Sequence, residues 1–118
     1  GEDIFWIAQP TRDPRIRAAL PLSPSSPGGV DPVPLFAGVE IPWMLMTGTL
    51  DVSVIGDTTV ADRLAVFPAL PQGGKYELVL FNGEHHAFTD RPLLPGQTPR
   101  NPAHHGEIRA LSTAFWDA

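Results

Sequence analysis

Three runs of apolar and β-prone residues predict β-strands in this chain. They cover Ile16–Leu22, Ile41–Thr47 and Tyr76–Phe81. The first is the weakest strand candidate because Pro21 interrupts it, whereas Pro42 lies near the start of the second, where a missing N–H is tolerated. Nearly continuous apolar runs, rather than strict alternation, are typical of parallel strands that are covered on both faces.

Two stretches with helical periodicity follow the second and third strands. In the first, Val60–Leu70, Thr59 is placed as an N-cap with Asp62 three residues later, although Pro68 weakens the last turn. The second stretch is His105–Trp116. The apolar faces predicted for the two helices are Val60, Leu64 and Phe67, and Ile108, Leu111 and Phe115.

Loops rich in proline and glycine, at Pro21–Pro34 and Asp90–Pro102, separate these elements. The order strand, long loop, strand, helix, strand, long loop, helix is typical of βαβ units. It predicts an α/β fold with part of a doubly wound parallel sheet. Three strands with so few helices leave at least one sheet edge uncovered, so we expect a partner at that edge, either a second copy or another part of the protein.

Composition excludes several classes of function. The 118 residues form at most one domain, and 42% apolar with 18% charged residues is ordinary globular composition. A net charge of −5 with a single lysine argues against nucleic acid as the main partner. The absence of cysteine excludes a disulfide scaffold, a thiolate zinc site and a cysteine nucleophile.

No apolar run approaches the roughly 18 residues of a membrane span, and the chain has no signal-peptide pattern. We therefore expect a soluble protein without a transmembrane segment, in a compartment that stays open between cytoplasmic and secreted. The chain begins Gly-Glu-Asp rather than with Met, which indicates a processed start or a piece of a longer polypeptide.

Asp51 is the first candidate for catalytic chemistry. Gly48 ends the second predicted strand, and Asp51 follows on the loop at its carboxyl end, where sites gather in open α/β sheets. An aspartate there can accept a hydrogen bond from a histidine N–H and stabilise the imidazolium. The alternative is a turn aspartate that bonds its own backbone.

The second candidate is the histidine doublet His85–His86 in the stretch FNGEHHAF, just past the carboxyl end of the third predicted strand. A histidine there can serve as a general base, and the alternative is a solvated loop residue. Neighbouring parallel strands are about 5 Å apart, so the two loops are expected to lie close together. A second doublet, His104–His105, has no recognised zinc spacing, and we interpret it as a solvated pair rather than as part of a metal site.

Three stretches together resemble the C-terminal half of an α/β-hydrolase, in the branch of dienelactone-hydrolase-like and chlorophyllase- or lipase-like esterases. They are IPWMLMTGTLD, KYELVLFNGEHHAF and the last helix, which ends in AFWDA. In that family the triad acid follows a Pro-apolar run-Gly-x-x-Asp pattern, which Pro42 to Asp51 fits. The histidine commonly follows as Gly-x-x-His-x-Phe, which Gly83 to Phe88 fits with His86 as the base.

The resemblance implies the last three core strands of that fold, a Ser-Asp-His triad and hydrolysis of a small-molecule carboxylic ester without a cofactor. Asp51 and His86 would be the acid and the base. His85 and Phe88 are weaker candidates for contact with substrate.

The sequence departs from the family because it contains no Gly-x-Ser-x-Gly, the turn that presents the nucleophile. We therefore expect residues 1–118 to be the C-terminal part of a single α/β-hydrolase domain, inactive alone because the nucleophile-bearing part is absent. The alternative is a catalytically inactive hydrolase remnant that acts as a binding or interaction module.

Overall fold

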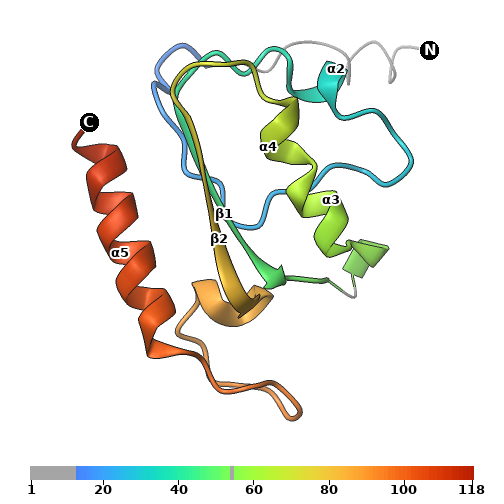
Figure 1. The fold of residues 1–118 in the computed structure, drawn as a ribbon, viewed down its shortest axis with the longest axis vertical. Coiled ribbons are helices and arrows are strands. Elements are labelled where there is room, and N and C mark those ends of the chain that lie inside the picture. The colour runs from blue at the N-terminus through green and yellow to red at the C-terminus, as the bar shows by residue number, and fades with distance from the viewer. Residues whose placement is uncertain (1–12, 54) are drawn as a thin grey trace.

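A computed structural model of the chain describes residues 13–53 and 55–118. The regular elements are α2 (Val33–Phe36), β1 (Trp43–Leu50), the 3-10 helix η1 (Ile55–Asp57), α3 (Val60–Leu64), α4 (Val66–Ala69), β2 (Lys75–Glu84), the 3-10 helix η2 (His85–Phe88) and α5 (Pro102–Trp116). They form a mixed α/β arrangement in which α3 and α4 lie on one side of a two-stranded sheet and α5 on the other (Figure 1).

The two strands confirm the second and third predicted strands and are parallel, as expected (Figure 1). Pairing runs in register from Trp43 to Gly48 and then shifts, so that Leu50 pairs with Glu84. The carboxyl ends of both strands therefore meet at one edge of the sheet, where η2 begins.

The first predicted strand does not form as a regular strand. It is reduced to two isolated parallel bridges with β1, between Ala19 and Trp43 and between Leu22 and Met46. Pro21 lies between them and accepts a bond from the Met46 N–H, but it has no N–H of its own to continue the ladder. The predicted three-stranded core is therefore only partly present among the described residues.

The helix predicted at Val60–Leu70 is divided into α3 and α4, while its N-terminus is as expected. The side chain of Thr59 accepts a hydrogen bond from the Asp62 N–H, and the Asp62 carboxylate accepts one from the Thr59 N–H. Its predicted apolar face is only partly correct, because Phe67 packs against the core but Leu64 does not. Arg63 and Val66 are buried whereas Leu64 is exposed, because a paired charge occupies a place where the sequence pattern expects an apolar residue.

The main core lies between β1 and these two helices. Leu45, Val66 and Leu70 are its buried members, and partly buried aromatic and aliphatic side chains pack around them: Phe36, Val39, Trp43 and Phe67. Each apolar side chain that leaves water here stabilises the fold by about 1.5–3 kcal/mol. The α3–α4 side of the sheet is thus fixed by packing, and it holds the loop after β1 in place.

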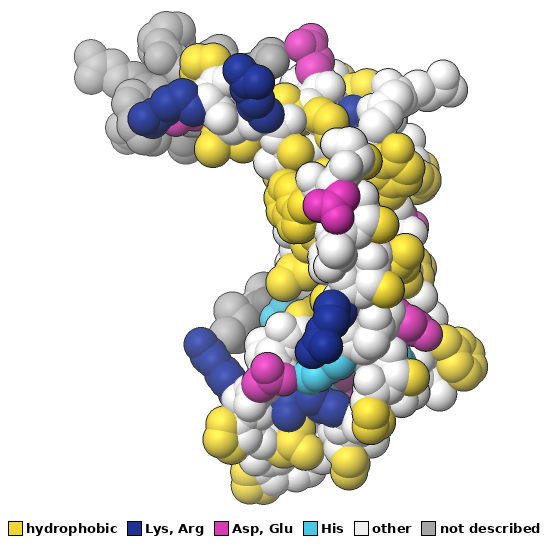
Figure 2. Space-filling view, turned by 90° about the vertical axis from the view of Figure 1, so that its left-hand side faces the viewer, with side chains coloured by type: hydrophobic (Ala, Val, Ile, Leu, Met, Phe, Trp, Pro, Cys, Tyr) yellow, Lys and Arg dark blue, Asp and Glu magenta, His cyan; other side chains and the backbone are white. Residues whose placement is uncertain are grey.

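The other side of the sheet is covered loosely by α5, which begins at Pro102 with Asn101 as its N-cap. Tyr76 and Phe115 make an edge-to-face contact with ring centroids 6.2 Å apart. A cavity of about 260 Å³ remains between the helix and the sheet, lined mainly by apolar side chains. Hydrophobic side chains are exposed over this face of the molecule (Figure 2). None of the helices in the described part of the chain is both long and apolar enough to cross a membrane.

Two glycines let the ends of the strands approach each other. A Cβ atom added at Gly48 would lie 2.1 Å from the carbonyl oxygen of Gly83. One added at Gly83 would lie 2.7 Å from the Cβ of Leu80. Contacts this short are impossible, so glycine is required at both positions. This close approach brings the loop after β1 against the start of η2.

Candidate functional site

Asp51 lies at the centre of a polar cluster just beyond the carboxyl end of β1. Its side chain is completely buried. Oδ2 accepts hydrogen bonds from the hydroxyls of Ser23 at 2.5 Å and Thr47 at 2.9 Å. Oδ1 lies 2.9 Å from Nδ1 of His85 and 3.1 Å from Nε of Arg63. Both oxygens are thus used twice, so the carboxylate is held in one orientation.

His85 is the most exposed member of this cluster. Its side chain is 60% exposed, while Asp51 behind it is fully buried. An ionised carboxylate can only accept, so the 2.9 Å contact requires a proton on Nδ1 of the ring. In the neutral histidine this leaves the lone pair on Nε2. The geometry is that of an acid that orients a base and stabilises its protonated form.

The structure does not bring His86 to Asp51, which corrects the pairing expected from the Gly-x-x-His register. Nδ1 of His86 lies 3.2 Å from Oε2 of Glu84, and Nε2 lies 2.8 Å from the carbonyl oxygen of Thr98. The reason is geometric. β2 ends at Glu84 and the chain turns into η2 at His85, so the two adjacent side chains point in different directions and only the first faces β1.

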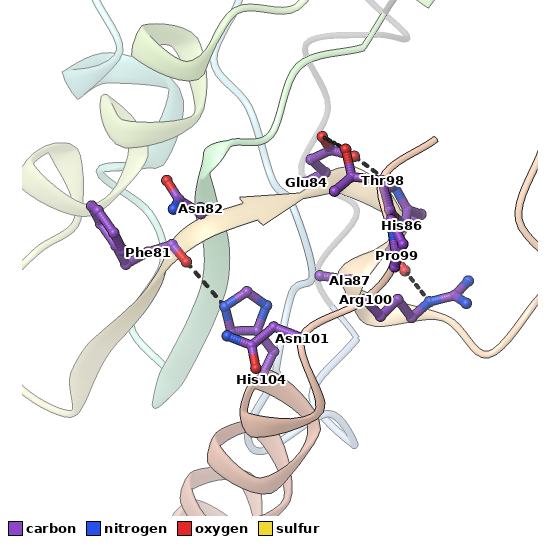
Figure 3. Close-up of a pocket in the computed structure, with 10 residues that line it drawn as sticks. All are labelled: Phe81, Asn82, Glu84, His86, Ala87, Thr98, Pro99, Arg100, Asn101 and His104. Atoms are coloured by element: carbon purple, nitrogen blue, oxygen red, sulfur yellow. Dashed lines mark hydrogen bonds and ion pairs between the residues drawn. The ribbon is translucent and has the colours of Figure 1, made fainter. Parts of the chain in front are cut away.

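His86 instead lies in a second cavity, of about 270 Å³, between the end of β2 and the loop that leads to α5 (Figure 3). Arg100 donates from Nε to the carbonyl oxygen of His86 at 2.9 Å, and the Thr98 hydroxyl donates to Glu84 at 3.1 Å. Nε2 of His104 contacts the carbonyl oxygen of Phe81 at 3.0 Å. These contacts hold the loop against β2 and η2. The polar groups around His86 are therefore bonded mainly to one another.

Phe88 and the second histidine doublet lie away from Asp51. Phe88 and His105 line a third cavity, of about 240 Å³, between η2 and α5. His105 is partly exposed and contacts Asp90 at 3.5 Å. His104 is buried, so the prediction of a solvated pair is wrong for His104. Within residues 13–53 and 55–118, no three His, Cys, Asp or Glu side chains come together as metal ligands would. Phe88 therefore packs beside α5 and does not line the Asp51–His85 pair.

Sequence reasoning missed three residues that contact Asp51, namely Ser23, Thr47 and Arg63. Thr47 precedes Asp51 by four residues on the same strand end, so its proximity was accessible from the sequence. Ser23 adopts a left-handed backbone conformation with φ of 53°, which is uncommon for a residue other than glycine. No sequence signal distinguishes it from the neighbouring loop serines. Arg63 looks like a solvated helix residue until its burial is known.

Comparisons of the chain with protein-family models, with curated proteins and with solved structures gave no match in any of the three. A buried carboxylate behind an accessible imidazole can move a proton to and from a group that approaches the exposed side of the ring.

Proposed function

We propose that this chain supplies the acid and the base of a serine hydrolase of the α/β-hydrolase type, which cleaves small carboxylic esters. Asp51 is the acid. His85, rather than His86, is the base. One observation carries the proposal: the buried Asp51 carboxylate lies 2.9 Å from Nδ1 of the exposed His85, beyond the carboxyl ends of two parallel strands.

In the proposed reaction, Nε2 of His85 takes the proton from a serine hydroxyl as its oxygen attacks the ester carbonyl carbon. The proton then passes to the alkoxide leaving group as the carbon–oxygen bond of the ester breaks. A water molecule then attacks the acyl-enzyme with His85 again as the base, which releases the carboxylic acid product and restores the serine hydroxyl. Asp51 keeps the ring in the Nδ1–H tautomer and stabilises the imidazolium in each half-reaction.

The proposal assigns the nucleophile and the oxyanion hole to a segment other than these 118 residues, which contain no Gly-x-Ser-x-Gly. Ser23 is a poor candidate for the nucleophile. Its hydroxyl donates to Oδ2 of Asp51, on the side of the carboxylate away from the oxygen that His85 contacts. The base would therefore not receive its proton.

A second candidate function is an inactive hydrolase remnant that binds a partner. The observation in its favour is that β2 pairs with β1 alone among the described strands and carries exposed aromatic side chains, with Phe81 77% exposed. The occupant would be a second copy or the rest of the hydrolase domain.

The test is a p-nitrophenyl acetate assay on the polypeptide that contains these residues together with the nucleophile-bearing segment. His85→Ala and Asp51→Asn should each lower kcat by on the order of 10³ or more, since a triad without its base or acid loses most of its effect. His86→Ala is the matched control and should change kcat by less than about tenfold.

Loss of turnover in His86→Ala with full turnover in His85→Ala would return the base to the position expected from the sequence register. If no ester is hydrolysed and a fluorophosphonate probe labels no serine, the hydrolase proposal fails and the binding module stands.

A further inference from the structure

Arg63 is a buried cation whose contacts all lead to the Asp51 cluster. It projects from α3, and its side chain is only 5% exposed. Nε donates to the carbonyl oxygen of Asp51 at 2.9 Å and lies 3.1 Å from Oδ1 of the same residue. Nη1 donates to the carbonyl oxygen of Ser23. Burying a guanidinium is unfavourable unless it is paired, so its position indicates a specific role at these loops.

The four groups in contact with the Asp51 carboxylate are divided by charge. Oδ2 accepts from two neutral hydroxyls, those of Ser23 and Thr47. Oδ1 faces the two groups that can be cationic, Arg63 and His85. The positive charge of Arg63 is permanent, whereas that of His85 depends on protonation. Arg63 and His85 therefore interact with the same carboxylate oxygen and the same negative charge.

We propose that Arg63 is a positioning residue of the Asp51–His85 pair. It fixes the carboxylate in the orientation that presents Oδ1 to the ring, and by offsetting the charge of Asp51 it limits how strongly that carboxylate favours the protonated form of His85. The His85 ring then faces a carboxylate that is already paired with a guanidinium, rather than a lone anion. The catalytic meaning of this role rests on the proposed hydrolase function.

Among the described residues, His85 contacts the carboxylate of Asp51, after β1, and Arg63, on α3, contacts the same carboxylate oxygen. Glu84 and His86 are adjacent in sequence, but they pair with each other at 3.2 Å. Arg100 is directed at the carbonyl oxygen of His86. The effect of Arg63 should therefore be separable from these contacts, and His86 serves as an internal reference.

The experiment is an NMR pH titration of the ring Cε1–H signals of His85 and His86 in the 118-residue chain. Arg63→Gln should raise the pH of half-titration of His85 by about one unit or more, since a nearby cation is removed. Arg63→Lys keeps the charge and should leave it within a few tenths of a unit. His86 should not change in either variant. An unchanged His85 in folded Arg63→Gln would overturn the proposal.

A second measurement decides the matter if Arg63→Gln does not fold. Coupling between two sites is reciprocal, so the Arg63 Nε–H signal of the wild type should shift with the half-titration pH of His85. This shift should vanish in His85→Gln, a change at an exposed side chain. An Arg63 Nε–H chemical shift that does not change as His85 titrates in the wild type would overturn the proposal.

Neither measurement uses ester turnover. Coupling between Arg63 and His85 without esterase activity would contradict the hydrolase function and leave the role of Arg63 intact. Esterase activity without this coupling would support the hydrolase function and contradict the role of Arg63.

Discussion

The adjacent residues His85 and His86 each pair with a carboxylate, and the two pairs differ in almost every physical respect. Asp51 and His85 come from different strand ends. The carboxylate is fully buried, the ring is 60% exposed, and three further donors contact the acid. Glu84 and His86 are two residues apart. Both are partly buried, with the ring 13% exposed, and they hold a loop.

Burial and exposure decide whether a carboxylate–histidine pair is useful for catalysis. In the first pair the acid is fixed and shielded while the base can be reached, so a proton can pass to a substrate. In the second pair both ring nitrogens of His86 contact acceptors, Glu84 and the Thr98 carbonyl. Neither nitrogen is therefore available to a substrate. The distance between acid and histidine alone does not distinguish a catalytic pair from a structural one. Burial of the acid together with exposure of the ring does distinguish them.

The largest effect is expected when the two acids are compared by matched amide substitutions. Asp51→Asn leaves the buried Arg63 without its counter-charge and should lower the free energy of unfolding by about 3–5 kcal/mol. Glu84→Gln removes a partly exposed charge and should cost less than about 1 kcal/mol. Urea denaturation monitored by circular dichroism measures both. Equal losses would mean that the two pairs are not different in kind.

An intermediate effect is expected when the two histidines are compared. His86→Ala removes the contacts to Thr98 and Glu84 and should lower the free energy of unfolding by about 1–3 kcal/mol, at about 0.5–1.5 kcal/mol per hydrogen bond. His85→Ala removes one contact from an exposed ring and should cost less than about 1 kcal/mol. The opposite order is expected for activity, where His85→Ala should lower kcat more than His86→Ala. The same two variants can therefore be ranked by stability and by activity. A larger loss of stability at His85 would contradict the division of roles.

The smallest effect concerns Glu77, a third carboxylate that lacks the donors of Asp51. Among the described residues its buried Oε2 has no hydrogen-bond partner, and burial raises the pKa of Glu77 above its ordinary value of about 4.5. The folded protein therefore retains this proton at a pH where the unfolded chain has lost it. Its contribution to stability is fully present below about pH 4.5 and is lost as pH rises toward the raised value.

Glu77→Gln should remove this loss. The stability of the variant relative to the wild type should rise between pH 4 and pH 7, because the amide carries no charge that burial penalises. Urea denaturation at the two pH values gives the difference, in which any effect of the amide at both pH values cancels. A relative stability that does not change with pH would show that Glu77 is solvated like a surface carboxylate.

Local chemistry explains which parts of the fold could be predicted. The parallel strands at Trp43 and Tyr76, the capping box at Thr59 and the last helix follow from residue preferences over a few neighbours, so the sequence was sufficient. The first strand failed because one missing N–H at Pro21 outweighs an apolar run. The face of α3 was mispredicted because periodicity cannot recognise a buried arginine that has found an aspartate.

The order of the residues along the chain is enough to bring an acid after one strand close to a histidine after the next, because neighbouring parallel strands end at the same edge of a sheet. Which histidine contacts the acid depends on how the elements pack. Side-chain direction at the turn from β2 into η2 depends on where the strand ends and on the contact between Gly48 and Gly83. The same holds for Ser23 and Arg63, whose proximity to Asp51 spans 28 and 12 residues of chain and exists only once the elements have packed.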